Sequence, residues 1–264
     1  MILDLGLEKK VILVTASSRG LGKAVAIAMA KEGAHLVICA REKAELIQTA
    51  RIIDKYGVKC LAIKCDLTKY EEVQNLIKET LETFGTIDVL VANCGGPPAG
   101  SFSEFKIEDW KNAINQVLMS SIFLCKEIIP VLKQKKKGRI IFITSVSVKQ
   151  PIKGLILSNV TRAGVAGLSK SLSEELGQDN ILINIVCPSY TNTQRVEELA
   201  DFLSIKQGIS KEKVIQNWGN LNALGRIAEP EEIANVVVFL ASTQASHITG
   251  VALQVDGGYI KSLY

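Results

Sequence analysis

The stretch that decides the fold is Thr15-Ala16-Ser17-Ser18-Arg19-Gly20-Leu21-Gly22, which follows directly on an apolar run and leads into a helical pattern. A glycine-rich turn between a strand and a helix lets the backbone approach a pyrophosphate. The first turn of the helix adds free N–H groups and the positive end of its dipole. Two glycines alone are weak evidence, because any tight turn of this kind can carry them. Placed after the first strand of a repeating strand–helix pattern, the turn predicts a dinucleotide site.

Short β-branched runs recur along the chain, and helical patterns separate them. The runs are Val11–Thr15, His35–Cys39, Cys60–Cys65, Ile87–Ala92, Arg139–Thr144, Ile181–Val186 and Val251–Val255. Their apolar residues fall on both faces, as a parallel sheet covered on both sides requires. The alternation covers all 264 residues. It predicts a single α/β domain, residues 1–264, with a Rossmann-like, doubly wound, seven-stranded parallel sheet and right-handed crossovers.

Local signals mark three helix ends. Gly33 is a good C-cap for a helix over Leu21–Glu32. Thr68-Lys-Tyr-Glu71 predicts a capping box for a helix that runs to Phe84. Glu229-Pro230-Glu231-Glu232 places proline and acids in a first turn.

One polar, irregular stretch, residues 189–224, follows the sixth run. It is expected to pass over the carboxyl edge of the sheet, where ligands bind in such folds. Its mixed content, with Gly208 and Gly219, suits a hinged substrate cover. We therefore expect a mobile lid over about residues 191–224.

Composition limits the partners. Lys and Arg number 31 against 27 Asp and Glu, and this net charge of +4 is too mild to predict a nucleic-acid partner. No apolar stretch approaches the roughly 18 residues of a membrane span, and the start of the chain lacks a signal-peptide layout. We therefore expect a cytoplasmic protein with no membrane partner. Six cysteines without a C-x-x-C pair and two histidines predict no metal site.

Further motifs resemble the short-chain dehydrogenase/reductase family over essentially the whole chain, and the pattern is most similar to the β-ketoacyl-acyl-carrier-protein reductases. The motifs are the turn itself, similar to T-G-x-x-x-G-x-G with Ala16 for the first glycine; Asp66-Leu67; Ala92-Asn93-Cys94-Gly95, similar to N-N-A-G; residues 184–193, similar to N-x-x-x-P-G-x-x-x-T with Ser189 for glycine; Gly225-Arg226 with Pro230-Glu-Glu; Ile248-Thr-Gly250; and Val255-Asp-Gly-Gly258. The resemblance implies an oxidoreductase that uses a nicotinamide cofactor.

The turn and the resemblance together predict the cofactor-binding residues Thr15, Ser17, Ser18, Arg19, Gly20, Leu21, Gly22, Arg41, Asp66, Leu67, Asn93, Gly95, Arg162, Pro188, Thr191 and Thr193. Charge favours NADP, with NAD as the alternative. The second strand ends without an acid to bind ribose hydroxyls, whereas Arg19 and Arg41 suit a 2′-phosphate. The competing interpretation is that Arg41 caps the next helix or faces solvent.

The resemblance also implies catalytic positions, and three of them are altered. Ser145 matches the family's serine, but the tyrosine and lysine of Y-x-x-x-K align with Ser158 and Arg162. The family's asparagine aligns with Val117 or Leu118. Tuning a tyrosine pKa of about 10 to neutrality costs about 4 kcal/mol, but a hydroxyl near 15.7, as in water, requires nearly 12. Ser158 therefore cannot replace the acid, and Arg162 is a binder rather than a proton donor.

Two groups of side chains could donate the proton in place of the missing tyrosine. Lys149 and Lys153 lie in the loop after Ser145, and Tyr190 follows the sixth strand beside the expected nicotinamide. The plainer interpretations are that these lysines are solvated and that Tyr190 packs against the cofactor.

The sequence thus leaves two functions open. One is a 3-oxoacyl-carrier-protein-reductase-like oxidoreductase acting on a small carbonyl or hydroxyl compound. The other is a weak or inactive cofactor-binding protein with a sensing or partner role.

Helices that are apolar on more than one face predict a homo-oligomer, and the family resemblance implies that it is a homotetramer. The residues concerned are Ile122, Phe123, Ile128, Ile129 and Val236–Leu240.

Overall fold

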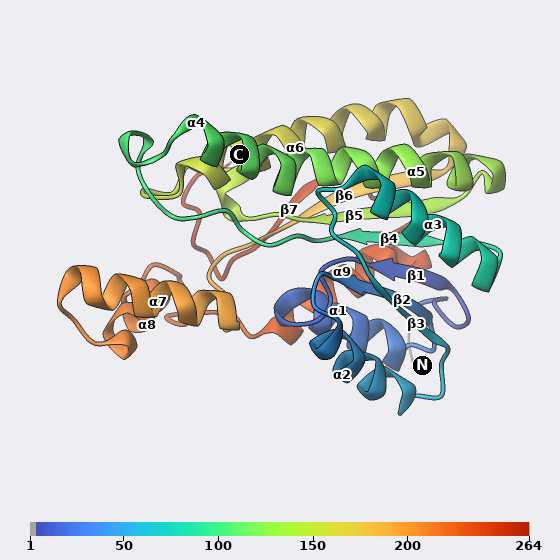
Figure 1. The fold of residues 1–264 in the computed structure, drawn as a ribbon, viewed down its shortest axis with the longest axis horizontal. Helices are drawn as coiled ribbons and strands as arrows, with labels where there is room; N and C mark the ends of the chain where they lie inside the picture. Colours follow the sequence, from blue (N-terminus) through green and yellow to red (C-terminus); the bar gives the residue numbers. More distant parts are fainter. Residues whose placement is uncertain (1–3, 264) are drawn as a thin grey trace.

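The computed structural model describes residues 4–263, and a seven-stranded parallel sheet runs through its centre (Figure 1). The strand order is β3-β2-β1-β4-β5-β6-β7. The strands are β1 (Val11–Val14), β2 (His35–Ala40), β3 (Cys60–Lys64), β4 (Val89–Ala92), β5 (Gly138–Ile143), β6 (Ile181–Pro188) and β7 (Ala252–Val255). The order reverses between β1 and β4, so a ligand crevice is expected where these two strands end. The predicted fold class is confirmed, with strand bounds within two residues of those expected.

Helices cover both faces of the sheet (Figure 1). One face packs on α1 (Gly20–Lys31), α2 (Lys43–Asp54) and α9 (Pro230–Ala241). The other packs on α3 (Tyr70–Phe84), α5 (Ser120–Lys135) and α6 (Ile156–Leu176). A short helix, α4 (Ile107–Ile114), and the π-helix η2 (Asn115–Met119) lead into α5, while the 3₁₀ turns η1 (Phe102–Glu104), η3 (Val146–Val148), η4 (Gly177–Asp179) and η5 (Thr243–Ala245) lie in connections. Each face therefore has its own apolar core.

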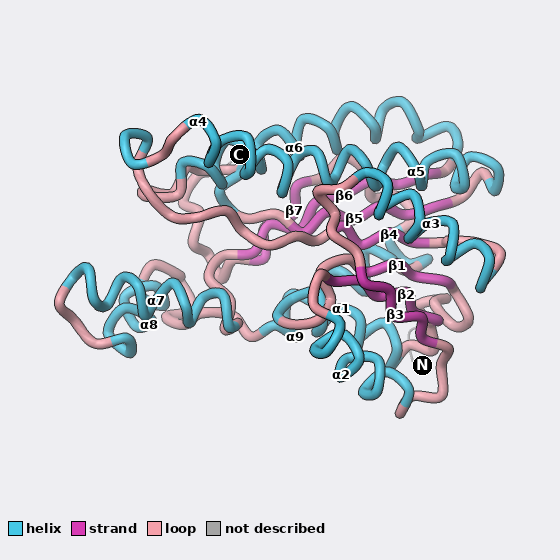
Figure 2. Tube along the Cα trace, viewed as in Figure 1, coloured by secondary structure: helices cyan, strands magenta, loops and turns pink. Residues whose placement is uncertain are grey.

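The stretch expected to be irregular is instead a helical hairpin, which projects from the carboxyl edge of the sheet (Figure 2). It consists of α7 (Gln194–Gln207) and α8 (Lys211–Asn220). The two helices bury a small cluster of their own around Ala200, Val214 and Trp218. Gly208 in the left-handed region ends α7, and the Ser210 side chain caps α8. The apolar content that looked scattered in the sequence is the inner face of this hairpin.

The capping box predicted at Thr68 is wrong. Helix α3 begins at Tyr70 with Lys69 at its N-cap and no side-chain cap. The Thr68 hydroxyl instead donates to Asp66 Oδ1 at 2.8 Å, and the Glu72 carboxylate accepts the Asp66 N–H at 2.8 Å. The preceding aspartate draws the threonine into an Asx turn. The other two signals are confirmed: α1 ends before Gly33, and α9 starts with Pro230 and acids in its first turn.

One helical run within residues 4–263, Ile107–Lys135, is long and apolar enough by length and composition to cross a membrane, contrary to the expectation from sequence. In this fold it packs against α3, α6 and the sheet, and Leu124, Ile128 and Leu132 on its inner side are almost fully buried. The run therefore packs on the rest of the chain along its inner side, and 33% of its most apolar 18-residue window is buried.

Several apolar residues that led us to expect a tetramer are also accounted for within one chain. Ile128, Val237 and Leu240 are fully buried, and Phe123 packs on Tyr70 with ring centroids 5.0 Å apart. The oligomeric state stays a prediction with less support than the sequence alone gave it.

Candidate functional site

The turn between β1 and α1 is shaped to receive a phosphate group. Gly20 has a φ of +56°, in the left-handed region, and the N-cap Arg19 makes no side-chain hydrogen bond to the first turn of α1. The N–H groups of that turn therefore remain available to an anion. A Cβ on Gly22 would stand 2.3 Å from the Ala16 carbonyl oxygen and 2.9 Å from Asn93 Nδ2. The residues present fit the pyrophosphate of a dinucleotide.

Two residues predicted to bind the cofactor have side chains with a different role. Thr15 and Ser17 are fully buried. The Thr15 hydroxyl donates to the Asn93 carbonyl at 2.7 Å and accepts the Asn93 N–H at 2.8 Å. The Ser17 hydroxyl donates to the Val14 carbonyl at 2.9 Å and accepts the Cys39 N–H at 3.1 Å. Because both hydroxyls are committed, they tie the turn to β4 and β2 instead of contacting a ligand.

Three of the residues predicted to bind the cofactor, Arg41, Asp66 and Leu67, lie just after β2 and β3 finish. Asp66 Oδ1 accepts the N–H and the hydroxyl of Thr68. Partial burial opposes the charge of Asp66, but these hydrogen bonds and the charges of Arg41 and Lys69 outweigh it and hold its pKa below the ordinary value. Leu67 beside it is half-buried. Arg41 is exposed, so it is placed beside the acid at this edge and open to a ligand.

Arg19 and Arg41 share no partner in the structure. Arg19 Nη1 lies 3.6 Å from a carboxylate oxygen of Glu198 on α7, with both side chains about half exposed. Such an exposed pair contributes little stability. The two arginines predicted to receive a 2′-phosphate are thus both accessible, but one is engaged with the helical hairpin.

The hairpin brings a further predicted residue to the phosphate turn. Thr193 is the N-cap of α7, and its side chain lies 3.6 Å from the position of a Cβ on Gly20. Pro188 ends β6 and is buried. Thr191 is also buried, and its hydroxyl donates to the Ser189 carbonyl at 3.3 Å. Thr193 is therefore the residue of this segment that closes over the turn.

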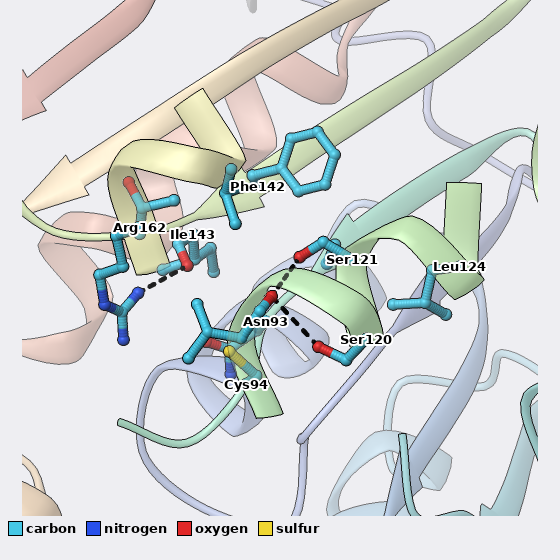
Figure 3. A pocket seen from close by; sticks show the side chains of 12 residues that line it. Asn93, Cys94, Ser120, Ser121, Leu124, Phe142, Ile143 and Arg162 are labelled. Atoms are coloured by element: carbon cyan, nitrogen blue, oxygen red, sulfur yellow. Dashed lines mark hydrogen bonds between the residues drawn. The ribbon is translucent and has the colours of Figure 1, made fainter. Parts of the chain in front are cut away.

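The three residues predicted to be catalytic, Ser145, Ser158 and Arg162, lie at the carboxyl end of β5 and in the first turns of α6. The Ser145 hydroxyl accepts the Ser147 N–H at 3.1 Å, which fixes the start of η3 against α6. Ser158 and Arg162 are each only 8% exposed. Arg162 Nε donates to the Ser158 hydroxyl at 3.1 Å. Nη1 donates to the Ile143 carbonyl at 3.4 Å (Figure 3). Arg162 is thus a buried cation that two hydrogen bonds hold in place.

A small pocket beside Arg162 is bounded by the π-helix η2 (Figure 3). Val117, one of the two residues expected at the family's asparagine position together with Leu118, lines this pocket. Its carbonyl accepts hydrogen bonds from the hydroxyls of Ser121 at 2.8 Å and Ser120 at 3.3 Å. A π-turn displaces the regular helical hydrogen bonds, and these two hydroxyls satisfy the displaced carbonyl.

Candidate proton donors differ in their surroundings. Tyr190 stacks on Trp218 with ring centroids 4.4 Å apart, and burial followed by the nearby Tyr259 raises its pKa to about 12. It is a packing residue of the hairpin, not a tuned acid. Lys153 is exposed in the loop before α6. Lys149 is exposed too. Burial raises the pKa of the nearby Cys187 thiol overall, whereas the charges of Lys149 and Arg162 lower it.

The sequence analysis missed two residues that reach the loop after β4. Gln116 on η2 donates to the Gly96 carbonyl at 3.5 Å and stands 3.0 Å from the position of a Cβ on Gly95. Arg195, in the first turn of α7, donates from Nη2 to the Pro97 carbonyl at 3.0 Å. Gln116 neighbours the altered asparagine position, and Arg195 lies two residues after Thr193. These adjacencies were the only signals available.

Comparisons with known proteins agree with the geometry. A family model described as enoyl-(acyl carrier protein) reductase matches residues 15–260. The 3-oxoacyl-(acyl-carrier-protein) reductase FabG of Aquifex aeolicus is 32% identical over 97% of this chain and 99% of its own. The granaticin polyketide synthase putative ketoacyl reductase 1 of Streptomyces violaceoruber is 32% identical over 95% and 93%.

Among solved structures, L-sorbose reductase from Gluconobacter frateurii, complexed with NADPH and L-sorbose, superposes with a TM-score of 0.94. It is 33% identical, and the match covers 99% of this chain and 100% of that one. With its phosphate turn, its strand order and these relatives along nearly its full length, the chain belongs to the short-chain dehydrogenase/reductase family.

Proposed function

We propose that this protein is an NADP-dependent oxidoreductase that interconverts a carbonyl and a hydroxyl group on a small molecule. The observation that carries the proposal is the uncapped, glycine-lined start of α1. Thr193 closes over this turn, and Arg162 lies beside the end of β5. Relatives described as ketoacyl reductases, and an NADPH complex of similar fold, support this choice. When bound, NADPH supplies the hydride.

The chain's own residues would act on the carbonyl oxygen by electrostatics. Hydride addition leaves negative charge on that oxygen, and a fixed cation in a water-poor site stabilises such charge most effectively. Arg162 is that cation, and its hydrogen bond to Ser158 leaves the serine hydroxyl able to donate to the oxygen. Ser145 adds a second hydroxyl. Lys149 is the proposed proton source, because it ends the η3 turn that Ser145 begins.

NADP is the proposed cofactor in preference to NAD. The end of β2 offers Arg41 and no acid in its place, and a 2′-phosphate suits an exposed guanidinium. Titration of both cofactors at fixed ionic strength should give tighter binding of NADP(H). Arg41→Ala should remove the preference for NADP over NAD. Arg51 is an exposed arginine on α2, so Arg51→Ala is the matched control and should keep that preference. Equal affinities in the wild type would rule out this assignment.

The activity is tested by following NADPH oxidation and NADP reduction against a broad panel of carbonyl and hydroxyl compounds. We expect slow turnover, because general acid catalysis by the missing tyrosine is worth roughly 10²–10⁴ in rate. The second candidate function, a cofactor-binding protein that senses nucleotide or serves a partner, is favoured by the absence of a tuned acid. Tight NADPH binding with no turnover on any compound would support that second function.

The remaining proposals concern motion, assembly and location. We propose that residues 191–224 form a lid that closes on cofactor, since contacts from α7 reach both the phosphate turn and the loop after β4. Hydrogen exchange in this segment should slow on NADPH binding; slow exchange that does not change would contradict it.

Assembly as a homotetramer and a cytoplasmic location are also proposed. A monomer in sedimentation at micromolar concentration would contradict the tetramer.

A further inference from the structure

Two arginines converge on the loop after β4 without a carboxylate partner. Arg162 Nη2 and Arg195 Nε each lie 3.9 Å from the position of a Cβ on Gly96. They come from two separate elements: Arg162 from α6, and Arg195 from the first turn of α7 in the hairpin. Within residues 4–263, neither guanidinium has a carboxylate within 4.0 Å. We call this pair the Gly96 clamp.

The burial of Arg162 makes the missing counter-charge significant. Its side chain is more than nine-tenths buried, and its two hydrogen bonds go to neutral oxygens, those of Ser158 and Ile143. Burial of a charge is costly unless an opposite charge pairs with it. Nη2 makes no hydrogen bond to any residue in the described part of the chain and is directed toward Gly96. The arrangement is complete only when an anion is present there.

The acids nearest Arg195 in sequence are engaged elsewhere. Glu198 pairs with Arg19 at 3.6 Å, and Glu197 lies 3.9 Å from Lys211 Nζ. The single hydrogen bond of Arg195, to the Pro97 carbonyl, holds the guanidinium over the loop without neutralising it. Its position in the first turn of α7 adds the positive end of a helix dipole. Both arginines of the clamp therefore present uncompensated positive charge to one position.

From this geometry we infer that the Gly96 clamp binds a carboxylate of the substrate, so that the preferred substrates are oxo acids or hydroxy acids rather than neutral ketones or esters. A carboxylate accepts hydrogen bonds from guanidinium groups in a matched planar geometry. The pyrophosphate of the cofactor has donors of its own at the start of α1, so the clamp is left for another anion. The inference rests on the proposed function and narrows its substrate class.

Binding is tested apart from turnover, with the full-length chain saturated with oxidised NADP, which cannot reduce a carbonyl. Calorimetric titration compares pyruvate with ethyl pyruvate and acetoacetate with ethyl acetoacetate. We expect the acid of at least one pair to bind at least about tenfold more tightly than its ester, as charge-assisted hydrogen bonds require. Equal affinities within both pairs would overturn the inference.

Variants locate the effect. Arg195→Gln alters an exposed residue and should reduce acid affinity about tenfold without changing ester affinity or thermal stability. Arg162→Lys keeps the charge and should weaken acid binding less than Arg162→Gln. Arg51→Gln, far from the site on α2, should change nothing. If Arg195→Gln weakened NADP binding but kept the preference for acids, the clamp would serve the cofactor and the inference would be wrong.

The outcome separates this inference from the proposed function. Reduction of neutral carbonyls by NADPH with no preference for acids leaves the oxidoreductase proposal standing and removes the clamp. Acid binding that depends on Arg195, without hydride transfer to any compound, keeps the clamp and removes the oxidoreductase.

Discussion

Replacing Ala16 by glycine should stabilise the protein. Ala16 stands where the family has glycine, and its φ of +46° lies in the left-handed region. That conformation costs an L-residue about 1–2 kcal/mol, whereas a glycine there loses about 0.5–1 kcal/mol more backbone entropy on folding. The difference predicts a gain of roughly 0.5–1 kcal/mol. In a chain of this size such a gain corresponds to about 1–4 °C in Tm.

The assay is thermal unfolding by calorimetry, with Ala24→Gly as the matched control. Ala24 lies in the regular part of α1, where glycine costs about 1 kcal/mol relative to alanine. Ala16→Gly should also leave NADPH affinity unchanged, because the Ala16 carbonyl keeps its hydrogen bond from Asn93 Nδ2 at 3.3 Å. A fall in Tm for Ala16→Gly equal to that of the control would refute the strain argument.

Three further predictions address the site and its surroundings. The double change Ser158→Tyr with Arg162→Lys restores the family's acid and should raise ketoester reduction by roughly 10²-fold or more in steady-state assays, whereas either change alone should not. Tyr190→Phe should leave the pH profile of turnover unchanged, because this buried phenol, with a pKa of about 12, packs on Trp218 and donates no proton; loss of an alkaline limb in the variant would contradict that role. The pKa of Glu232, measured by NMR, should be about 2, because Arg226 binds its carboxylate. The pair therefore stabilises the fold fully above the ordinary pKa of 4.5, and this stabilisation is lost as the pH falls to about 2. Arg226→Gln should return the pKa of Glu232 toward 4.5.

The sheet and the phosphate turn were predictable because their signals are local. Buried parallel strands require β-branched runs such as Ile181–Val186, and a close backbone approach requires a residue without a side chain at Gly22. These constraints appear in the sequence without knowledge of the rest of the fold. The structure places Ser158 and Arg162 one turn apart on α6, as their spacing in the sequence indicates, but their catalytic role stays a prediction.

Features that depend on distant contacts were not predictable. The amphipathic hairpin α7–α8 buries only a small cluster, so its sequence resembles a polar loop. The Asx turn at Asp66 took the hydroxyl expected to cap α3. Nothing near Arg195 in the sequence indicates that it reaches the Pro97 carbonyl, 98 residues away. Its pairing with Arg162 across Gly96 arises only when the hairpin folds over the sheet edge.

The most direct test of the central claim is hydride transfer itself. The wild-type chain is incubated with NADPH that carries deuterium at the transferable position and with a panel of oxo acids and ketones, and the products are analysed by mass spectrometry. This measurement detects turnover too slow for absorbance. We predict deuterium on the former carbonyl carbon of an alcohol or hydroxy-acid product. This signal should be lost in Gly22→Ala, because the added Cβ would stand 2.3 Å from the Ala16 carbonyl oxygen. Tight NADPH binding without deuterium in any product would contradict the claim that this site transfers hydride.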